Sequence, residues 1–321
     1  MSLLEVSHLR KTFHGSVVAV DDVSFHVAEG EIFGLVGPNG AGKTTTMTML
    51  AGLLKPDRGS IRFQGQPFDP GQYEHRAMLG MVPQNLAIYP DLTALENLRF
   101  FGGLYGMRGA KLKQRVDAVL DLTGLTERAD SLVKTFSGGM RRRLNFGVAL
   151  LHQPRLVILD EPTVGVDPQS RSHLLDAVKQ LCRDGVSVLY ASHYMEEVKA
   201  ICHRVAILDH GRLLECGTLP ELLSNVPREL RLSISHSSPT LVERLHGLAQ
   251  VQPSSNGELH VTLSLNGHAE MANGAAMHLD EQLRQVMDVL RGCGAELRSI
   301  ESEEHNLERL FLKLTGNRLR D

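Results

Sequence analysis

A glycine-rich segment constrains the fold of this chain more strongly than any other feature. It reads Gly37-Pro38-Asn39-Gly40-Ala41-Gly42-Lys43-Thr44. A short, continuous apolar run at residues 31–37 leads into it, and a helical pattern follows at residues 43–54. An apolar run of this length is typical of a strand buried on both faces of a sheet. The sequence therefore predicts a strand, a loop and a helix in direct succession.

This segment fits the pattern G-x-x-x-x-G-K-[ST], whose chemistry suits phosphate groups. Glycines let the backbone wrap so that successive N–H groups point at phosphate oxygens, and the helix N-terminus adds positive potential. Lys43 would bridge the phosphate oxygens, and the Thr44 hydroxyl would ligate Mg²⁺. The alternative is a tight glycine turn with an exposed lysine, which the strand and helix on either side disfavour.

Three later apolar runs predict further strands of the same sheet. They cover residues 156–160, 186–192 and 205–208, and helical patterns such as 171–183 lie between them. Strands that alternate with helices are typical of a mostly parallel sheet covered by helices. The predicted fold class is therefore α/β.

Residues from about 85 to 151 carry helical rather than strand patterns, which predicts a helical subdomain inserted in the sheet domain. Thr93 and Glu96 have the spacing of a capping box at the start of its first helix. A second helix is expected at about 111–122 and a third after Ser137.

The pattern changes again after about residue 227. Apolar residues recur at every second position, as expected for strands, in two runs: Leu230, Leu232 and Ile234, then Leu259, Val261, Leu263 and Leu265. Helices are expected at 240–247, 280–291 and 305–314, and polar loops at 254–257 and 266–274. We predict two domains, 1–225 and 226–321, the second a small α+β module joined near residues 225–228.

Two adjacent acids, Asp160 and Glu161, lie at the end of the apolar run 156–160. Ligands of open α/β sheets bind at the carboxyl edge of the strands. Asp160 suits a direct or water-mediated contact to Mg²⁺, and Glu161 can accept a proton from a water that attacks a phosphate. An acid pair alone more often only begins a loop. The phosphate loop in the same chain favours the catalytic interpretation.

A second anion-binding helix end is predicted at Ser137-Gly138-Gly139. A serine N-cap and two residues without Cβ leave the first turn of the helix open to an anion. A plain capped helix is the alternative. The acid pair follows this segment after a single helix and a break at Pro154, and this order favours the functional interpretation.

The charge and apolar patterning exclude several classes of protein. Lys+Arg 34 and Asp+Glu 37 give a formal net charge of −3, so no general basic field points to nucleic acid as a partner. No apolar run approaches the ~18 residues of a membrane-spanning helix, and the polar start of the chain does not fit a signal peptide. The cysteines are scattered singly, which predicts neither a zinc site nor a disulfide framework and fits a reducing cytosol: Cys182, Cys202, Cys216 and Cys293.

Taken together, these segments resemble the ATP-binding cassette (ABC) ATPases over about residues 1–225. The sequences around Ser137-Gly138-Gly139 and Asp160-Glu161 resemble the daunorubicin-resistance and multidrug-export type, as does the ending 307–316. The resemblance implies a P-loop NTPase cassette with a RecA-like sheet core, an antiparallel β part and the helical subdomain, followed by the C-terminal module.

The resemblance also implies roles for residues that spacing alone leaves without one. Gln84 matches a residue that senses Mg²⁺ and the attacking water, and His193 one that binds the γ-phosphate. Phe13 falls where the family stacks an aromatic ring on adenine, and Asp167 matches an acid that reports on the opposite site of a dimer. The full nucleotide-binding set is then Phe13, Gly37, Pro38, Asn39, Gly40, Ala41, Gly42, Lys43, Thr44, Thr45, Ser137, Gly138, Gly139 and Asp167.

Two features near the second helix end need separate interpretation. Met140 stands where the family usually has Gln or Glu, and a thioether cannot hydrogen-bond a ribose hydroxyl as an amide does. Arg141, Arg142 and Arg143 spread over nearly the full circumference of a helix. We expect them to be solvated or ion-paired rather than a nucleic-acid or lipid patch.

The implied function is that of an ATP-hydrolysing subunit of an exporter. Two copies would close head to tail on ATP and Mg²⁺, drive a separate integral membrane permease, and lie at the cytoplasmic face of the bacterial inner membrane. The catalytic set would be Glu161, His193, Gln84 and Lys43, and the metal set Thr44, Gln84 and Asp160. The alternative is a soluble ABC ATPase that acts on ribosomes or DNA. A nucleotide-binding scaffold without turnover is disfavoured because both acids are intact.

Overall fold

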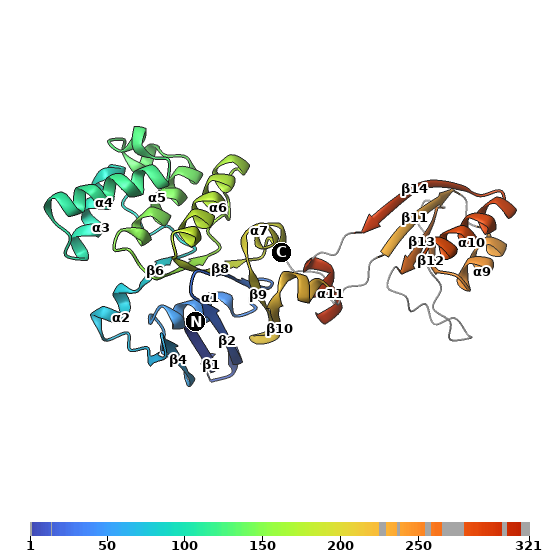
Figure 1. The fold of residues 1–321 in the computed structure, drawn as a ribbon, viewed down its shortest axis with the longest axis horizontal. Coiled ribbons are helices and arrows are strands. Elements are labelled where there is room, and N and C mark those ends of the chain that lie inside the picture. Colours follow the sequence, from blue (N-terminus) through green and yellow to red (C-terminus); the bar gives the residue numbers. More distant parts are fainter. Residues whose placement is uncertain are drawn as a thin grey trace. The chain divides into compact units, whose positions relative to one another are not determined.

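The computed structural model describes residues 2–13, 15–224, 229–235, 238–253, 258–264, 279–303 and 307–315. The chain divides into two compact units, residues 1–222 together with the chain from Phe311 onward, and residues 223–310 (Figure 1). Of the described residues in the predicted module, 226–321, residues 311–315 belong to the first unit. The predicted junction at 225–228 and the predicted loops at 254–257 and 266–274 lie outside the described residues.

A six-stranded sheet forms the centre of the first unit, with the order β10-β9-β3-β8-β7-β6. All neighbours are parallel except β10, which pairs antiparallel with β9. Strands β3, β7 and β8 are buried along their whole length, as the continuous apolar runs predict. The bounds are β3 Ile32–Val36, β6 Leu79–Val82, β7 Leu156–Asp160, β8 Ser187–Ser192, β9 Arg204–Asp209 and β10 Arg212–Thr218.

This strand order sets the position of the predicted site. β3 lies beside β8, and β8 lies beside β7. The phosphate loop, the acid pair and the residue after Ser192 therefore leave the sheet at one carboxyl edge. Helix α1 (Lys43–Leu50) follows the loop, and ends four residues before the predicted limit at residue 54.

A second, antiparallel sheet has the order β2-β1-β4-β5. Its strands are β1 Ser2–Phe13, β2 Val17–Ala28, β4 Arg58–Phe63 and β5 Gln66–Pro67. Apolar residues of β1 and β2 share one buried cluster with residues of α1, β3 and β7. The expected antiparallel β part is thus packed on the core that carries the phosphate loop.

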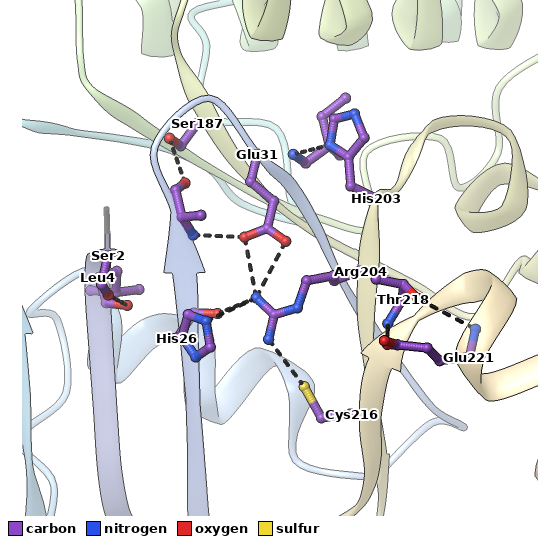
Figure 2. Close-up of polar contacts among 12 residues, drawn as sticks. Ser2, Leu4, His26, Glu31, Ser187, His203, Arg204, Cys216, Thr218 and Glu221 are labelled. Atoms are coloured by element: carbon purple, nitrogen blue, oxygen red, sulfur yellow. Dashed lines mark hydrogen bonds and ion pairs between the residues drawn. The ribbon is translucent and has the colours of Figure 1, made fainter.

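Arg204 ties the start of β9 to β2 and β3 (Figure 2). Its Nη1 donates to the Glu31 carboxylate oxygens over 3.4 and 3.5 Å and lies 3.2 Å from His26 Nε2. Glu31 Oε2 also accepts from the Ala28 backbone N–H over 2.6 Å. Because Glu31 directly precedes β3, this ion pair anchors the end of that strand opposite the phosphate loop.

The helical subdomain contains three helices that pack on one another, α3 Ala94–Leu104, α4 Gly109–Leu122 and α5 Gly138–Leu150 (Figure 1). The predicted capping box is confirmed: Thr93 Oγ1 accepts from the Glu96 N–H, and the Glu96 carboxylate accepts from the Thr93 N–H. The shorter helices of the first unit are α2 Tyr73–Ala77, η1 Thr126–Arg128, η2 Val133–Thr135, α7 Met195–Ile201 and α8 Leu219–Ser224, and the longer α6 is Pro168–Arg183.

The described residues of the second unit form an antiparallel sheet, β12-β13-β11-β14, together with helices α9 and α10. Its bounds are β11 Glu229–Ser235, α9 Pro239–His246, β12 Gln250–Pro253, β13 Leu259–Ser264, α10 Leu279–Gly292 and β14 Glu296–Glu303. The two strands predicted from alternation are confirmed, although Leu265 lies outside the described residues. The alternation did not predict β12 or β14. Helix α11 (Leu307–Thr315) spans Phe311, where the chain returns to the first unit.

Candidate active site

The glycine loop follows a path that side chains would block at two points. A Cβ at Gly37 would lie 2.2 Å from the Leu208 carbonyl oxygen. Gly42, the N-cap of α1, has a φ of +97°, and its Cβ would lie 2.4 Å from the Ala19 carbonyl oxygen. A backbone oxygen cannot yield to an added carbon, so glycine is required at both positions.

Lys43 lies inside this loop with its side chain almost wholly buried. Its Nζ donates to the carbonyl oxygens of Gly37 (2.7 Å) and Pro38 (3.1 Å). The same Nζ lies 3.2 Å from Glu161 Oε1. A buried ammonium group is tolerated only beside such oxygens. The Lys43 ammonium group places one positive charge within the glycine loop, as binding of phosphate requires.

Thr44 and Asp160 form an oxygen pair beside the lysine. Thr44 Oγ1 donates to Asp160 Oδ1 over 3.2 Å, and Asp160 is 1% exposed. Burial raises the pKa of the Asp160 carboxyl, and the nearby Glu161 charge adds to this, whereas the Thr44 hydrogen bond and the Lys43 charge oppose it. Hydroxyl and carboxylate oxygens are the ligands that Mg²⁺ prefers, so these two residues fit the ion.

Glu161 is the point at which the predicted catalytic residues meet. Its Oε1 lies 3.2 Å from both Lys43 Nζ and His193 Nδ1, and its Oε2 accepts from Gln84 Nε2 over 3.3 Å. Glu161 is 5% exposed and has a φ of +48°, in the left-handed region. Such backbone strain in a residue other than glycine occurs mainly at functional sites.

Helix α5 holds the loop that carries Gln84. The Arg142 guanidinium donates to the Gln84 carbonyl oxygen, and Asn145 Oδ1 accepts from the Ala87 N–H over 3.0 Å. Arg143 donates to the Thr123 carbonyl oxygen over 2.7 Å. The expectation that these arginines are solvated or ion-paired is therefore wrong for Arg142 and Arg143, because carbonyl oxygens of neighbouring loops come within reach of the helix.

The second predicted anion site begins α5. Ser137 is its N-cap, and Ser137 Oγ accepts from the Met140 N–H over 3.2 Å. A Cβ at Gly139 would lie 2.2 Å from Ser170 Oγ, whereas a Cβ at Gly138 would meet only ordinary contacts. Among the described residues, no hydrogen bond or ion pair joins this helix end to the phosphate loop.

Phe13 and Asp167 lie outside the cluster around Glu161. Phe13 ends β1 and is 37% exposed, with Lys11 Nζ 5.9 Å from its ring centroid. Asp167 is the N-cap of α6, and its Oδ1 accepts from the Ser170 N–H over 2.9 Å. This backbone hydrogen bond is the main reason that the pKa of Asp167 is lowered.

Fold and site together define a P-loop nucleoside triphosphatase: a glycine cradle with a buried lysine, opposite an acid pair at the carboxyl edge of a parallel sheet. Residues 20–164 match the family model described as ABC transporter. The linearmycin resistance ATP-binding protein LnrL of Bacillus subtilis (strain 168) is 41% identical over 321 residues, 99% of this chain and 100% of LnrL. The chain therefore belongs to the ABC transporter family, and it is an ATP-binding subunit that hydrolyses ATP.

Two further comparisons extend the likeness. The daunorubicin/doxorubicin resistance ATP-binding protein DrrA of Streptomyces peucetius is 35% identical and covers 98% of this chain and 92% of its own length. A solved dimeric structure of the ATP-binding cassette MJ0796, in a post-hydrolysis state with ADP and Pi, matches with a TM-score of 0.61 at 25% identity. It covers 68% of this chain and 99% of MJ0796.

Proposed function

We propose that this chain is the ATPase subunit of an ABC exporter and that Glu161 is its catalytic base. The observation that carries this is the convergence of Lys43, Gln84 and His193 on one buried carboxylate. The three side chains come from elements far apart in the sequence. Their meeting at the carboxyl edge of the sheet supports a shared chemical task.

Each residue of the cluster has a task that its surroundings support. The Glu161 carboxylate takes up the proton of the attacking water, Gln84 holds that carboxylate in place, and His193, beside it, binds the γ-phosphate. Lys43 and the loop N–H groups bind the phosphates, helped by the start of α1 at Thr44 and Thr45. Thr44, Asp160 and Gln84 would hold Mg²⁺, which neutralises phosphate charge when bound.

We propose that two copies of the chain complete each site head to tail. In one protomer, no hydrogen bond or ion pair among the described residues links Ser137-Gly138-Gly139 to the phosphate loop. The MJ0796 cassette, a structural neighbour, is described as dimeric. In the proposed dimer, Ser137, Gly138 and Gly139 of one copy face the phosphates held by the other. Phe13 stacks on adenine, and Asp167 contacts the opposite site.

We propose further that the dimer drives separate membrane permease subunits at the cytoplasmic face of the bacterial inner membrane. None of the described helices is both long and apolar enough to cross a bilayer. The names of LnrL and DrrA connect those relatives with drug resistance. These names favour export over the soluble alternative that acts on ribosomes or DNA. Residues 1–225 would be the ATPase domain and 226–321 an accessory module.

The decisive variant is Glu161→Gln, which keeps the size of the side chain but removes the base. We expect it to retain ATP binding, to accumulate as a closed dimer, and to lose turnover by about 10²- to 10⁴-fold. Phosphate release and size-exclusion chromatography with ATP measure the two effects. Glu196→Gln, at an exposed acid, is the matched control. Turnover equal to that of the parent would remove Glu161 from the mechanism.

A further inference from the structure

The buried carboxylate of Glu197 is used by none of the roles above. Glu197 lies in α7, four residues after His193, and is 3% exposed. Its Oε2 accepts hydrogen bonds from three hydroxyl groups: Thr163 Oγ1 at 2.8 Å, Tyr190 Oη at 2.7 Å and Ser192 Oγ at 3.2 Å. A buried carboxylate is costly without such donors, so these hydroxyls offset the loss of water.

The other carboxylate oxygen of Glu197 faces helix α6. Arg171 Nε lies 3.3 Å from Glu197 Oε1, and the Arg171 guanidinium lies 4.9 Å from the ring centroid of Tyr194. The Tyr194 ring in turn lies 4.2 Å, between centroids, from the ring of His193. The ion pair thus joins α6 to Glu197, and the two ring contacts join α6 through Tyr194 to His193, the residue proposed to bind the γ-phosphate.

The partners of Glu197 come from the segments that carry the catalytic residues. Thr163 lies two residues after Glu161, and Ser192 directly precedes His193. Arg171 lies in the first turn of α6, where its backbone N–H donates to the Asp167 carbonyl oxygen over 2.9 Å. We infer that Glu197 is a positioning residue, which fixes the Glu161 loop, the His193 loop and the start of α6 relative to one another.

The backbone at Glu161 needs such support. Its left-handed φ of +48° persists only where the surrounding contacts hold it. The loop has a backbone tie to β8, from the Glu161 N–H to the Ala191 carbonyl oxygen over 3.1 Å. The hydrogen bond from the Thr163 hydroxyl to the Glu197 carboxylate adds a side-chain contact to this loop. Loss of this contact would let the carboxylate of Glu161 move, and a displacement of about 1 Å can slow a reaction about 100-fold.

The first test compares Glu197→Leu and Glu197→Gln with Glu196→Leu. Leucine keeps most of the volume but removes both acceptors, whereas glutamine keeps one carbonyl oxygen for the hydroxyls. We expect kcat to fall about 10- to 100-fold in Glu197→Leu and less in Glu197→Gln, with the affinity for ATP changed by less than about threefold. Glu196, the exposed neighbour on α7, provides the control and should leave both values unchanged.

Turnover is normalised to the number of ATP sites, titrated with Mg²⁺ and a nonhydrolysable ATP analogue, so that loss of folded protein does not count as loss of kcat. If Glu197→Leu does not fold, Thr163→Val and Ser192→Ala test the same ties one at a time. Each should lower kcat, and combined with Glu197→Gln they should lower it by less than the product of the single effects. Parent-like kcat in Glu197→Leu, or in both Thr163→Val and Ser192→Ala, would overturn the inference.

This inference rests on the proposed roles of Glu161 and His193. The inference and the proposed function can nevertheless fail separately. If Glu161→Gln abolishes turnover while the Glu197 variants keep kcat, only the positioning role is lost. If Glu161→Gln keeps turnover, the proposed catalytic base itself is wrong. A fall in kcat for Glu197→Leu would then identify a different route by which α7 supports the site, and the inference as stated would fail with its premise.

Discussion

The side-chain amide of Gln84 donates to Glu161 Oε2 over 3.3 Å, across 77 residues of chain. The carbonyl group of the same Gln84 is held by Arg142 of α5. One residue therefore joins the proposed catalytic base to the helical subdomain. A shift of α5 relative to the sheet would act on Glu161 through this pair of contacts.

Replacing Gln84 should slow turnover more than it weakens binding. Gln84→Ala removes a hydrogen bond to Glu161 while leaving the phosphate loop intact. At saturating Mg²⁺, we expect kcat to fall about 10- to 100-fold with little change in the affinity for ATP. Steady-state kinetics and ATP titration measure the two. Gln114→Ala, at an exposed glutamine of α4, is the control. A loss of affinity that matches the loss of kcat would contradict the proposed role.

Mixing two inactive variants tests the head-to-tail dimer. Lys43→Ala removes the phosphate-binding charge, and Ser137→Arg blocks the opposite helix end. Each variant alone should lose turnover. A mixed dimer contains one site in which both residues are intact, so random mixing should restore about a quarter of the parent turnover if one site suffices. The measurement is phosphate release at several mixing ratios. Parent-like turnover by either variant alone would exclude this arrangement.

Asp160→Asn should make the protein more stable and less active. Burial, the largest cause, raises the folded-state pKa of Asp160 above its ordinary value of 3.8, so ionisation is less favourable in the folded chain. The free-energy cost of ionising Asp160 in the folded chain is absent below pH 3.8. It grows as the pH rises from 3.8 to the folded-state pKa and is constant at higher pH. We therefore expect the variant to melt a few degrees higher at neutral pH, about 2–4 °C, and to need more Mg²⁺.

Thermal unfolding across the acid-to-neutral range checks the sign of this effect. The stabilisation of Asp160→Asn relative to the parent should increase as the pH rises and then level off. Asp176→Asn, at an exposed acid of α6, should show no such trend. A variant that is less stable than the parent at neutral pH would show that the ionised Asp160 stabilises the fold.

Replacing Gly138 or Gly139, at the start of α5, with alanine should change the stability of the protein by different amounts. A Cβ at Gly139 would lie 2.4 Å from Ser170 Cβ, so Gly139→Ala should lower the free energy of unfolding by about 1–3 kcal/mol. The nearest atom to a Cβ at Gly138 is the Gly165 carbonyl oxygen at 3.6 Å, an ordinary contact. Gly138→Ala should therefore keep the parent stability and lose only ATP-dependent association.

Denaturant unfolding and size-exclusion chromatography separate these outcomes. Adding Ser170→Gly to Gly139→Ala removes the clashing carbon and should restore part of the lost stability. Association of Gly138→Ala equal to that of the parent would remove this glycine from the proposed dimer contact.

The sequence could predict those parts of the fold that follow from consecutive residues. The strand, loop and helix around Lys43 and the capping box at Thr93 depend on local backbone geometry and on apolar spacing. Strand β14 could not be predicted in this way, because its sequence mixes charged and apolar residues and Ile300 remains 50% exposed. Its pairing with β11 in the sheet forms the strand, rather than its own pattern.

The residues of the site also divide into those that the sequence indicated and one, Glu197, that only the structure revealed. The end of an apolar strand indicated Asp160 and Glu161, and the resemblance of short segments indicated Gln84 and His193. It gave no indication of Glu197, since an acid on a short helix is most often exposed to solvent. The one feature of the sequence that could have drawn attention to Glu197 was its position four residues after His193.

The amino-acid sequence alone determined which residues could meet phosphate and an attacking water, because glycines, a lysine and adjacent acids carry that chemistry wherever they lie. Only the tertiary structure decided which of them share one site. The order of β3, β8 and β7 brings segments separated by more than a hundred residues to one sheet edge, and this order depends on pairing between distant strands. The same long-range packing buries Glu197 among hydroxyl groups that no local pattern could assign to it.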